Sequence, residues 1–366
     1  MPAQEDSLKT STASAPTPTA APIPTAASMP APAAAHGAHA ERSPWAEPPC
    51  LVCGSCVPEL GEQIARLVDV PLIERRIERF PDGEMYVQLA QSVRGRDAYV
   101  LQSTSAPAND HLFELLLLLD TLHRASAARL TAVIPYYGYA RQERKSSGRE
   151  PITAKLVANL LVAAGADRIV SVDLHSPAIQ GFFDIGMDHL TAVPLLADYL
   201  EPRIPRASVL VSPDTGGVKR ADLFASRLDL PIAILHKRRA SAREVAIAAV
   251  VGDVRDKYPI IVDDIVATGG TIRQAVDTLI HEGARPEVRV VATHGVLAGD
   301  ATRLLDHPAI REVIVTDTIP IPLSTRRSLP RLHVVSVADL LASAIQRLHH
   351  GHSLSEMFPR NGAPPV

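Results

Sequence analysis

Residues 260–272 have the sequence IIVDDIVATGGTI, in which an apolar run meets two acids and then two glycines between threonines. The apolar run predicts a buried parallel strand, and the amphipathic residues that follow predict a helix beginning near Thr271. The glycines let backbone N–H groups approach a phosphate, and Thr268 and Thr271 add hydroxyl donors. Asp263 and Asp264 stand where carboxylates would accept hydrogen bonds from a sugar diol. The stretch predicts a sugar-phosphate site, although a plain strand-to-helix turn has a similar pattern.

Composition is typical of a globular protein with a sizeable core. The chain has 366 residues, 46% of them hydrophobic, which suggests about two domains beyond any tail. The formal net charge of −3 gives no bulk attraction to nucleic acid or to an anionic membrane. No stretch approaches about 18 uninterrupted apolar residues, so no transmembrane helix is predicted. We therefore expect neither a nucleic-acid partner nor a membrane partner.

Three cysteines, Cys50, Cys53 and Cys56, lie close together. Their spacing would suit a metal knuckle, but no second Cys or His pair follows at a suitable distance. An odd count argues against a disulfide framework. We therefore expect small apolar residues on and after a first strand, in a protein of a reducing compartment, the cytoplasm.

Residues 1–48 form an extension rich in Ala, Pro, Ser and Thr. This composition cannot bury enough apolar surface to offset chain entropy, so disorder is predicted. A secretory signal would need a basic start and a continuous apolar core. An organellar transit peptide would carry several arginines, whereas none precedes Arg42.

Beyond residue 50, apolar strands alternate with helical stretches. Strands are predicted at 97–103, 130–134, 168–172, 208–211, 232–235, 259–262, 288–293 and 312–316, and helices at 109–127, 154–164, 218–228 and 271–282. Strands separated by helix-length segments imply right-handed crossovers and parallel sheets. The sequence therefore predicts an α/β fold with two sheets of similar design.

Polar side chains follow several predicted strands, where parallel sheets bind their ligands. Asp173 and His175 follow one strand, and Asp214, Lys237 and Asp263 each follow another. Asp173 and His175 stand two apart, so both could approach one divalent ion. Mg²⁺ prefers few protein ligands together with substrate phosphates. A structural histidine and a helix-capping acid are the alternatives for His175 and Asp214.

Three further stretches carry aromatic or basic side chains. Residues 79–84 (RFPDGE) could recognise a purine, although an ordinary type I turn has the same spacing. Residues 135–149, with three tyrosines and four cations, suit a polyphosphate, or simply form a solvated basic loop. Residues 236–239 (HKRR) hold three adjacent cations. Such a group either faces an anion whose charge spreads during reaction or forms a basic loop that binds nothing.

These stretches together resemble the ribose-phosphate pyrophosphokinases, also called PRPP synthetases. The resemblance covers about residues 50–360 in order and leaves out only the extension. The matching stretches are RFPDGE, SVRG (92–95), AVIPYYGYARQERK, PITAKLVANLL, AGAD (164–167), VDLHSPAIQGFFDIGMDHL, VSPDTGGVKRA, HKRR, VGDV (251–254), VDDIVATGGT, THGVL (293–297) and RLHHGHSLSEMF. It implies two phosphoribosyltransferase-like domains, at 49–192 and 193–348, and a tail at 349–366 that packs back on the first.

The resemblance also implies an activity. The family transfers the β,γ-pyrophosphoryl group of MgATP to the anomeric oxygen of ribose 5-phosphate, which gives PRPP and AMP. Positioning, metal and cations account for such a reaction without a covalent intermediate. The implied cofactor is Mg²⁺, with Mn²⁺ as an alternative. The implied partners are ATP, ribose 5-phosphate and further copies of the chain, since the family pattern is a hexamer built of dimers.

Residue roles follow from the same resemblance. Ribose 5-phosphate would be bound by Asp214, Asp263, Asp264, Ala267, Thr268, Gly269, Gly270 and Thr271, with the last four holding the phosphate. ATP would be bound by Arg141 and Gln142, and from a neighbouring subunit by Phe80, Asp82, Gly83 and Glu84. Mg²⁺ would be bound by His175 and Asp214, with Asp173 as an outer partner. Lys237 and Arg239 would be catalytic, stabilising the transferring group.

Three positions depart from the family pattern. Ala267 stands where Asp is common, but the cradle depends on backbone, so activity is expected to be kept. Glu143 replaces an Asp, and Ser146 stands where many members carry an acid. Because that region contributes to phosphate activation and ADP inhibition in regulated members, we expect altered allosteric control. The extension matches no family segment.

Three rival functions are possible alternatives to this one. A catalytically silent regulatory relative would usually lack the lysine region or the sugar-phosphate loop, and both are present here. A phosphoribosyltransferase that consumes PRPP would share the loop at 263–271 but not RFPDGE or VDLHSP. A nucleic-acid-binding function of the basic loop predicts salt-sensitive binding and has no other support.

Overall fold

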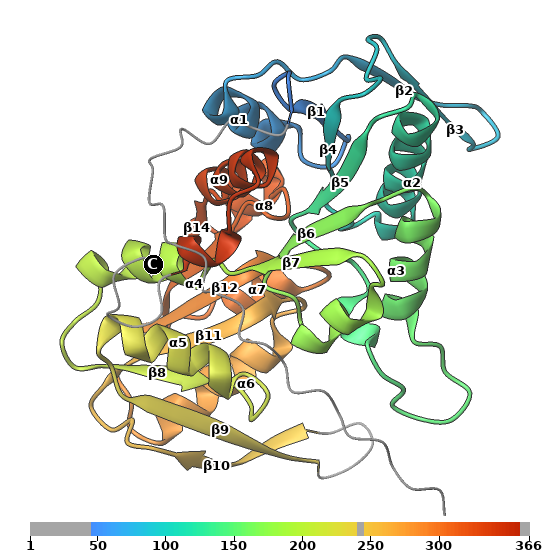
Figure 1. Ribbon diagram of the computed structural model, residues 1–366. Helices are drawn as coiled ribbons and strands as arrows, with labels where there is room; N and C mark the ends of the chain where they lie inside the picture. Colours follow the sequence, from blue (N-terminus) through green and yellow to red (C-terminus); the bar gives the residue numbers. More distant parts are fainter. Residues whose placement is uncertain (1–44, 240–244, 359–366) are drawn as a thin grey trace, which may run out of the picture. The chain divides into compact units, whose positions relative to one another are not determined.

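The computed structural model describes residues 45–239 and 245–358, with side chains described at 45–236 and 249–358. The predicted α/β class, with parallel sheets flanked by helices, is confirmed (Figure 1). Most of the predicted N-terminal extension, up to residue 44, lies outside the described residues. From Arg42 onward the chain forms one compact unit.

The first sheet is parallel throughout and has the order β1-β4-β5-β6-β7. Its strands are β1 (Cys50–Cys53), β4 (Asp97–Leu101), β5 (Arg129–Ile134), β6 (Arg168–Val172) and β7 (Gly186–Leu190). Helices α2 (Ala108–Arg124) and α3 (Thr153–Ala163) pack on one face. Helix α1 (Pro58–Val68) and the late helix α9 (Ala338–His350) pack on the other. Burial on both faces explains why these strands are nearly continuous apolar runs.

A separate antiparallel hairpin joins β1 to β4. It consists of β2 (Arg75–Arg79) and β3 (Met85–Leu89), with residues 80–84 as its turn. The hairpin lies beside α2, and Arg79 forms an ion pair of 2.9 Å with Asp110 in the first turn of that helix. Figure 1 shows it at the end of the first sheet that is remote from β11 and α6.

The second sheet has the order β10-β9-β8-β11-β12-β13-β14, with only β10 antiparallel to its neighbour among the described strands. Its strands are β8 (Ser208–Ser212), β9 (Ile232–Arg239), β10 (Val245–Val251), β11 (Tyr258–Val266), β12 (Val288–Gly295), β13 (Ile310–Thr316) and β14 (Leu332–Val335). Its helices are α4 (Val193–Leu200), α5 (Val218–Leu228), α6 (Gly270–His281), α7 (Ala301–Leu305) and α8 (Leu323–Ser328). Short 3₁₀ turns occur at Ala140–Gln142, Pro177–Phe182, Glu201–Arg203 and Leu354–Met357.

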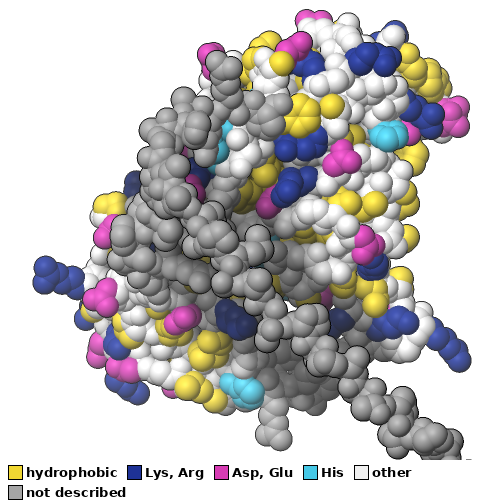
Figure 2. Space-filling view, viewed as in Figure 1, with side chains coloured by type: hydrophobic (Ala, Val, Ile, Leu, Met, Phe, Trp, Pro, Cys, Tyr) yellow, Lys and Arg dark blue, Asp and Glu magenta, His cyan; other side chains and the backbone are white. Residues whose placement is uncertain are grey.

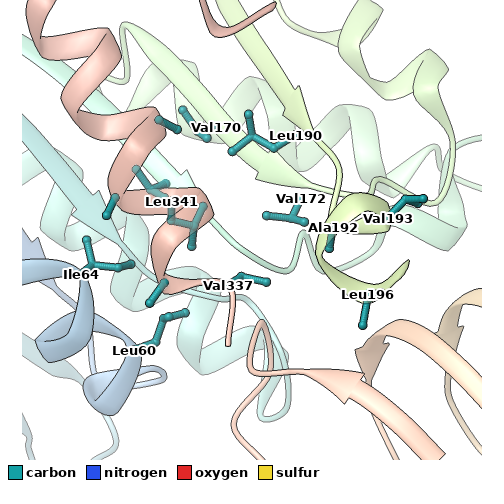
Figure 3. Close-up of a cluster of buried hydrophobic side chains, with 14 of the residues drawn as sticks. Leu60, Ile64, Val170, Val172, Leu190, Ala192, Val193, Leu196, Val337 and Leu341 are labelled. Atoms are coloured by element: carbon teal, nitrogen blue, oxygen red, sulfur yellow. The ribbon is translucent and has the colours of Figure 1, made fainter. Parts of the chain in front are cut away.

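One hydrophobic core is shared by the two sheets. Figure 3 shows Leu60 and Ile64 of α1 and Leu341 of α9 near Val170 and Val172 of β6, and the same cluster includes residues of β8, β11, β12 and β13. Helix α9, which follows the last strand of the second sheet, therefore packs back against the first sheet. The domain boundaries predicted after residues 48, 192 and 348 stay predictions.

The C-terminal end of α9 is tied to the first sheet by polar contacts. His349 Nδ1 lies 2.8 Å from the buried carboxylate of Asp97, and Arg129 donates to the carbonyl of Leu348 at 2.9 Å. Arg129 also makes a bidentate contact with Asp97. These contacts hold the start of the predicted tail, whose last residues, 359–366, lie outside the described part of the chain.

The expectation for the cysteines is confirmed. Cys50 and Cys53 lie on β1 and Cys56 follows it, and all three are buried free thiols. Burial raises the pKa of Cys50 to about 11. Among the described helices, none combines the length and the apolar composition that a membrane span requires.

Candidate functional site

The acid pair lies inside a strand, which corrects the sequence prediction that β11 ends at Val262. Strand β11 continues to Val266 because its pairing with β12 extends that far. Its pairing with β8 on the other side ends at Ile261. From Val262 onward, β11 therefore has no paired strand on the β8 side, and Arg220 of α5 lies beside the two acids.

The predicted glycine loop and helix follow directly. Gly269 has a left-handed backbone (φ 79°) and is the N-cap of α6, which begins at Gly270, one residue before the predicted start. A side chain at Gly269 would strain this turn. The first N–H groups of α6 have no partner within the helix, so this end is suited to an anion.

A cavity of about 240 Å³ lies beside this loop. It is lined by Arg141, His175, Asp214, Asp263, Asp264, Ile265, Val266, Ala267, Thr268, Gly269, Thr271 and Ile272. His175 follows β6 of the first sheet, whereas the three aspartates and the glycine loop belong to the second sheet. The cavity therefore forms where the carboxyl ends of strands from two sheets meet.

Asp264 links the two sheets electrostatically. Its Oδ2 lies 2.7 Å from Nδ1 of His175, and its Oδ1 accepts a hydrogen bond of 3.3 Å from Arg220. Burial alone would raise the pKa of Asp264, but the hydrogen bond from His175 and the charge of Arg220 outweigh it and hold the pKa below its usual value. The bond to Asp264 in turn raises the pKa of His175.

Asp263 has the opposite electrostatic behaviour. Burial, together with the charge of Asp264, raises the pKa of Asp263 to about 8. Its Oδ1 accepts the N–H of Asp264 at 2.9 Å and lies 3.7 Å from Arg220. At neutral pH the pair therefore carries about one negative charge opposite one guanidinium.

Asp214 organises the loop after β8. Its Oδ1 accepts the N–H groups of Gly216 and Gly217, at 2.9 and 3.1 Å, just before α5. The side chain thus orders the turn that leads into α5, where the N-cap is Gly217 and not Asp214, so the helix-capping alternative does not describe its contacts; it also lines the cavity.

The residues that line the cavity could hold a divalent metal if water and substrate supply most of its ligands. Among the described residues, no three His, Cys, Asp or Glu side chains form a ready metal cluster. However, His175 and Asp214 line the same cavity. Mg²⁺ commonly takes one or two protein ligands and completes its shell with water and substrate phosphates, so the residues present fit it.

The predicted ATP contacts divide between two places. Arg141 lines the cavity, whereas the side-chain oxygen of Gln142 accepts a hydrogen bond from Thr153. Phe80, Asp82, Gly83 and Glu84 form the turn of the β2–β3 hairpin and are absent from the cavity lining. Phe80 is 46% exposed.

Three predicted residues differ from the rest in what the structure shows of them. Lys237 and Arg239 belong to β9 by their backbone, but their side chains lie outside the described part of the chain. Asp173 is only 7% exposed and is not part of the cavity lining. Its Oδ2 accepts the N–H of Ala192 and the hydroxyl of Thr293. Its outer-partner role at a metal stays a prediction.

Arg220 contacts both acids of the pair and was not predicted as a site residue. A signal was available, because Arg220 is a cation in the first turn of α5. A cation at that end opposes the helix dipole, so it needs nearby acids. Thr293 and His294 were also missed, and their contacts with Asp173 carry no local signal.

Comparisons with known proteins agree with one another. One family model, described as the N-terminal domain of ribose phosphate pyrophosphokinase, matches residues 50–165, and another, the phosphoribosyl synthetase-associated domain, matches residues 238–359. The ribose-phosphate pyrophosphokinase of Gloeobacter violaceus is 49% identical over 84% of this chain and 92% of its own length. That of Bacillus subtilis is 48% identical over 82% and 94%. The crystal structure of phosphoribosylpyrophosphate synthetase from Mycobacterium smegmatis aligns with a TM-score of 0.77 and 46% identity, over 83% of this chain and 100% of that chain.

Proposed function

Because this chain belongs to the ribose-phosphate pyrophosphokinase family, we propose that it makes PRPP and AMP from MgATP and ribose 5-phosphate. The observation that carries the proposal is the cavity in which the acid pair, the glycine loop of α6 and His175 meet. A silent regulatory relative would not need all three. The relatives over most of this chain bear the name of the enzyme.

Ribose 5-phosphate would bind along the end of β11. The N–H groups at the start of α6, with the hydroxyls of Thr268 and Thr271, suit its phosphate. Ala267 stands where many family members carry an Asp. Because backbone N–H groups form the cradle, the missing carboxylate leaves the cradle unchanged. Asp263 and Asp264 would accept hydrogen bonds from the ribose hydroxyls. Arg220 keeps the charge of that pair from repelling the sugar phosphate.

The reaction then needs alignment more than covalent catalysis. A new bond joins the anomeric oxygen to the β-phosphorus of ATP, and the bond from that phosphorus to the α-phosphate oxygen breaks, which releases AMP. His175 and Asp214 would hold Mg²⁺, which supplies charge neutralisation at the phosphates. Arg141, Lys237 and Arg239 would add positive charge to the transferring group.

The direct test of this function is AMP release from MgATP by the purified chain. AMP that forms only with ribose 5-phosphate, at one PRPP per AMP, is the expected result. Binding of ATP or ribose 5-phosphate without AMP would favour the silent regulatory relative instead.

We further propose a homo-oligomer in which the hairpin turn of one subunit completes the ATP site of another. The hairpin is remote from β11 and α6 of its own chain (Figure 1), and residues of those two elements line the cavity. Beside it, α2 and α3 expose Phe113, Leu156 and Leu160, and Figure 2 shows hydrophobic side chains along this edge. A second copy would cover such a patch. A hexamer built of dimers would agree with the family pattern.

Mixed oligomers test this arrangement. His175→Ala and Phe80→Ala are each expected to be nearly inactive alone, since each removes one half of every site. Co-expressed, they are expected to recover activity in roughly a quarter of the sites, because random mixing leaves that share with both halves intact. Activity is measured on the co-purified mixture. No recovery in an oligomer proved to be mixed would contradict a shared site.

Altered allosteric control remains part of the proposal. Position 146 carries Ser and not an acid. In this turn, Glu150 accepts hydrogen bonds from the N–H groups of Ser146 and Ser147 and from the hydroxyl of Ser147. We expect phosphate to activate this protein less than acid-bearing family members, and Ser146→Asp to increase the response. A phosphate-activation curve that is normal in the unmodified chain would contradict this.

We place the activity in the cytoplasm, because ATP and ribose 5-phosphate are intracellular metabolites and the three buried cysteines are free thiols.

A further inference from the structure

The loop that carries His175 begins at a strained residue. Asp173, the first residue after β6, has φ 38°, a left-handed backbone that non-glycine residues rarely adopt. Within the first sheet, its N–H donates to the carbonyl of Leu190 at 2.9 Å, and the N–H of Leu174 donates to Nε2 of His189 at 2.8 Å. A strained residue persists when its surroundings over-determine it.

Two neighbouring residues at the end of β12 add contacts from the other sheet. Thr293 donates its hydroxyl to Oδ2 of Asp173 at 2.6 Å. Nε2 of His294 lies 3.1 Å from the carbonyl oxygens of both Val172 and Asp173. Carbonyls only accept, so Nε2 of His294 must carry the proton.

A contact at the other ring nitrogen, Nδ1, supports the same tautomer of His294. Its Nδ1 lies 2.8 Å from the hydroxyl of Thr318, which donates to it. His294, Thr293 and Thr318 are each at most 2% exposed. The ring of Tyr136 packs edge-on against His294 with centroids 5.0 Å apart. Water cannot replace hydrogen bonds at such a site, so each contact constrains the geometry.

These contacts close a ring around the proposed metal ligand. Strand β12 is the neighbour of β11, and His294 is opposite Ile265, next to Asp264. Asp264 contacts His175 at 2.7 Å, and His175 stands two residues after Asp173. The same two strands therefore hold the loop at its base, through His294, and at its tip, through Asp264.

We propose that His294, together with Thr293, is a positioning residue that orients the Asp173–His175 loop so that His175 faces the divalent cation. The inference rests on the proposed function, in which His175 binds Mg²⁺. It gives Asp173 a positioning role instead of an outer-partner role at the metal. The alternative is that these contacts only join the two sheets.

The test compares four variants of the full chain. His294→Leu removes the shared donor, and Thr293→Val removes the hydroxyl at nearly constant shape. His294→Gln returns an N–H donor near the position of Nε2. Ser103→Ala is the matched control, because Ser103 donates to the carbonyl of Thr318 and also joins the sheets, but does not touch the loop.

Two measurements report on the metal site. One is the Mg²⁺ concentration that half-activates PRPP synthesis, taken beside the KM for ribose 5-phosphate. The other is direct binding of Mn²⁺, followed by loss of its free paramagnetic resonance signal. We expect His294→Leu and Thr293→Val to raise the half-activating Mg²⁺ concentration, and to lower the affinity for Mn²⁺, by about 10- to 100-fold each. Removal of a residue that orients a metal ligand has an effect of this size. The KM for ribose 5-phosphate should change by less than about twofold, since the loop of α6 is untouched. His294→Gln should recover much of the loss, and Ser103→Ala should show none.

The opposite results are equally clear. Lower thermal stability with unchanged metal dependence, or an equal rise in the KM for ribose 5-phosphate, would overturn the inference. If His294→Leu does not fold, Thr293→Val decides. His175→Ala separates the two levels of the argument. If His175→Ala leaves Mn²⁺ binding unchanged, the metal assignment of the proposed function fails. If it weakens binding while Thr293→Val does not, only the positioning inference fails.

Discussion

Asp264→Asn is expected to lower kcat/KM for ribose 5-phosphate by roughly 100- to 1000-fold, on the scale of removing one charge-assisted contact and misplacing one metal ligand. The carboxylate bonds both His175 and Arg220. An amide has no charge for either partner, and it leaves the guanidinium with Asp263 alone, at 3.7 Å. Steady-state kinetics with varied Mg²⁺ and varied ribose 5-phosphate measure the effect.

The neighbouring acid supplies the matched control for that prediction. No hydrogen bond joins Asp263 to His175, and burial raises the pKa of Asp263 to about 8, so that this carboxyl favours its protonated form at neutral pH. Asp263→Asn should therefore raise the KM for ribose 5-phosphate by about 10-fold, the cost of one weakened polar contact, and leave the Mg²⁺ dependence unchanged. Identical kinetic profiles for the two variants would contradict the separate tasks assigned to the two acids.

Local signals in the sequence were sufficient for most elements around the site. Helix α5 has the predicted bounds, 218–228, because Gly217 precedes it and Asp229 ends it in a left-handed conformation. Strand β6 also has its predicted bounds, 168–172. In both cases an apolar pattern is bounded by residues that stop it, and the pattern needs no knowledge of distant partners.

Elements that depend on a partner strand were predicted less well. Strand β11 runs four residues past its predicted end because β12 pairs with it as far as Val266. Strand β10, residues 245–251, was not predicted, although it is an apolar run. It is defined by antiparallel pairing with β9, and sequence alone does not reveal that pairing.

The site shows the same division between local and distant information. Short stretches of sequence were enough to predict the glycine loop, the acid pair and the His175 loop, and all three line one cavity. The contact between Asp173 and Thr293 joins residues 120 positions apart. Both are ordinary strand-end residues in the sequence, and only folding gives them a shared role.

Lys237→Ala is expected to lower kcat by about 10³- to 10⁵-fold, the range found for cations that stabilise phosphoryl transfer. The backbone supports such a position. Strand β9 pairs with β8 only as far as Ile234, and then continues to Arg239 beside β10 alone. Lys237 therefore lies on a two-stranded extension beyond the end of β8, the strand that leads to Asp214.

The strand supplies its own control for this prediction. The period of two along a strand predicts that Lys237 and Arg239 act together and that Arg238 does not act with them. Arg238→Ala should therefore change kcat by less than about 10-fold, whereas Arg239→Ala should follow Lys237→Ala. The apparent affinity for MgATP, measured by equilibrium binding, should fall only modestly in Lys237→Ala, because the charge acts mainly in the transition state. Equal losses in binding and in turnover would instead make Lys237 a general anchor for the nucleotide.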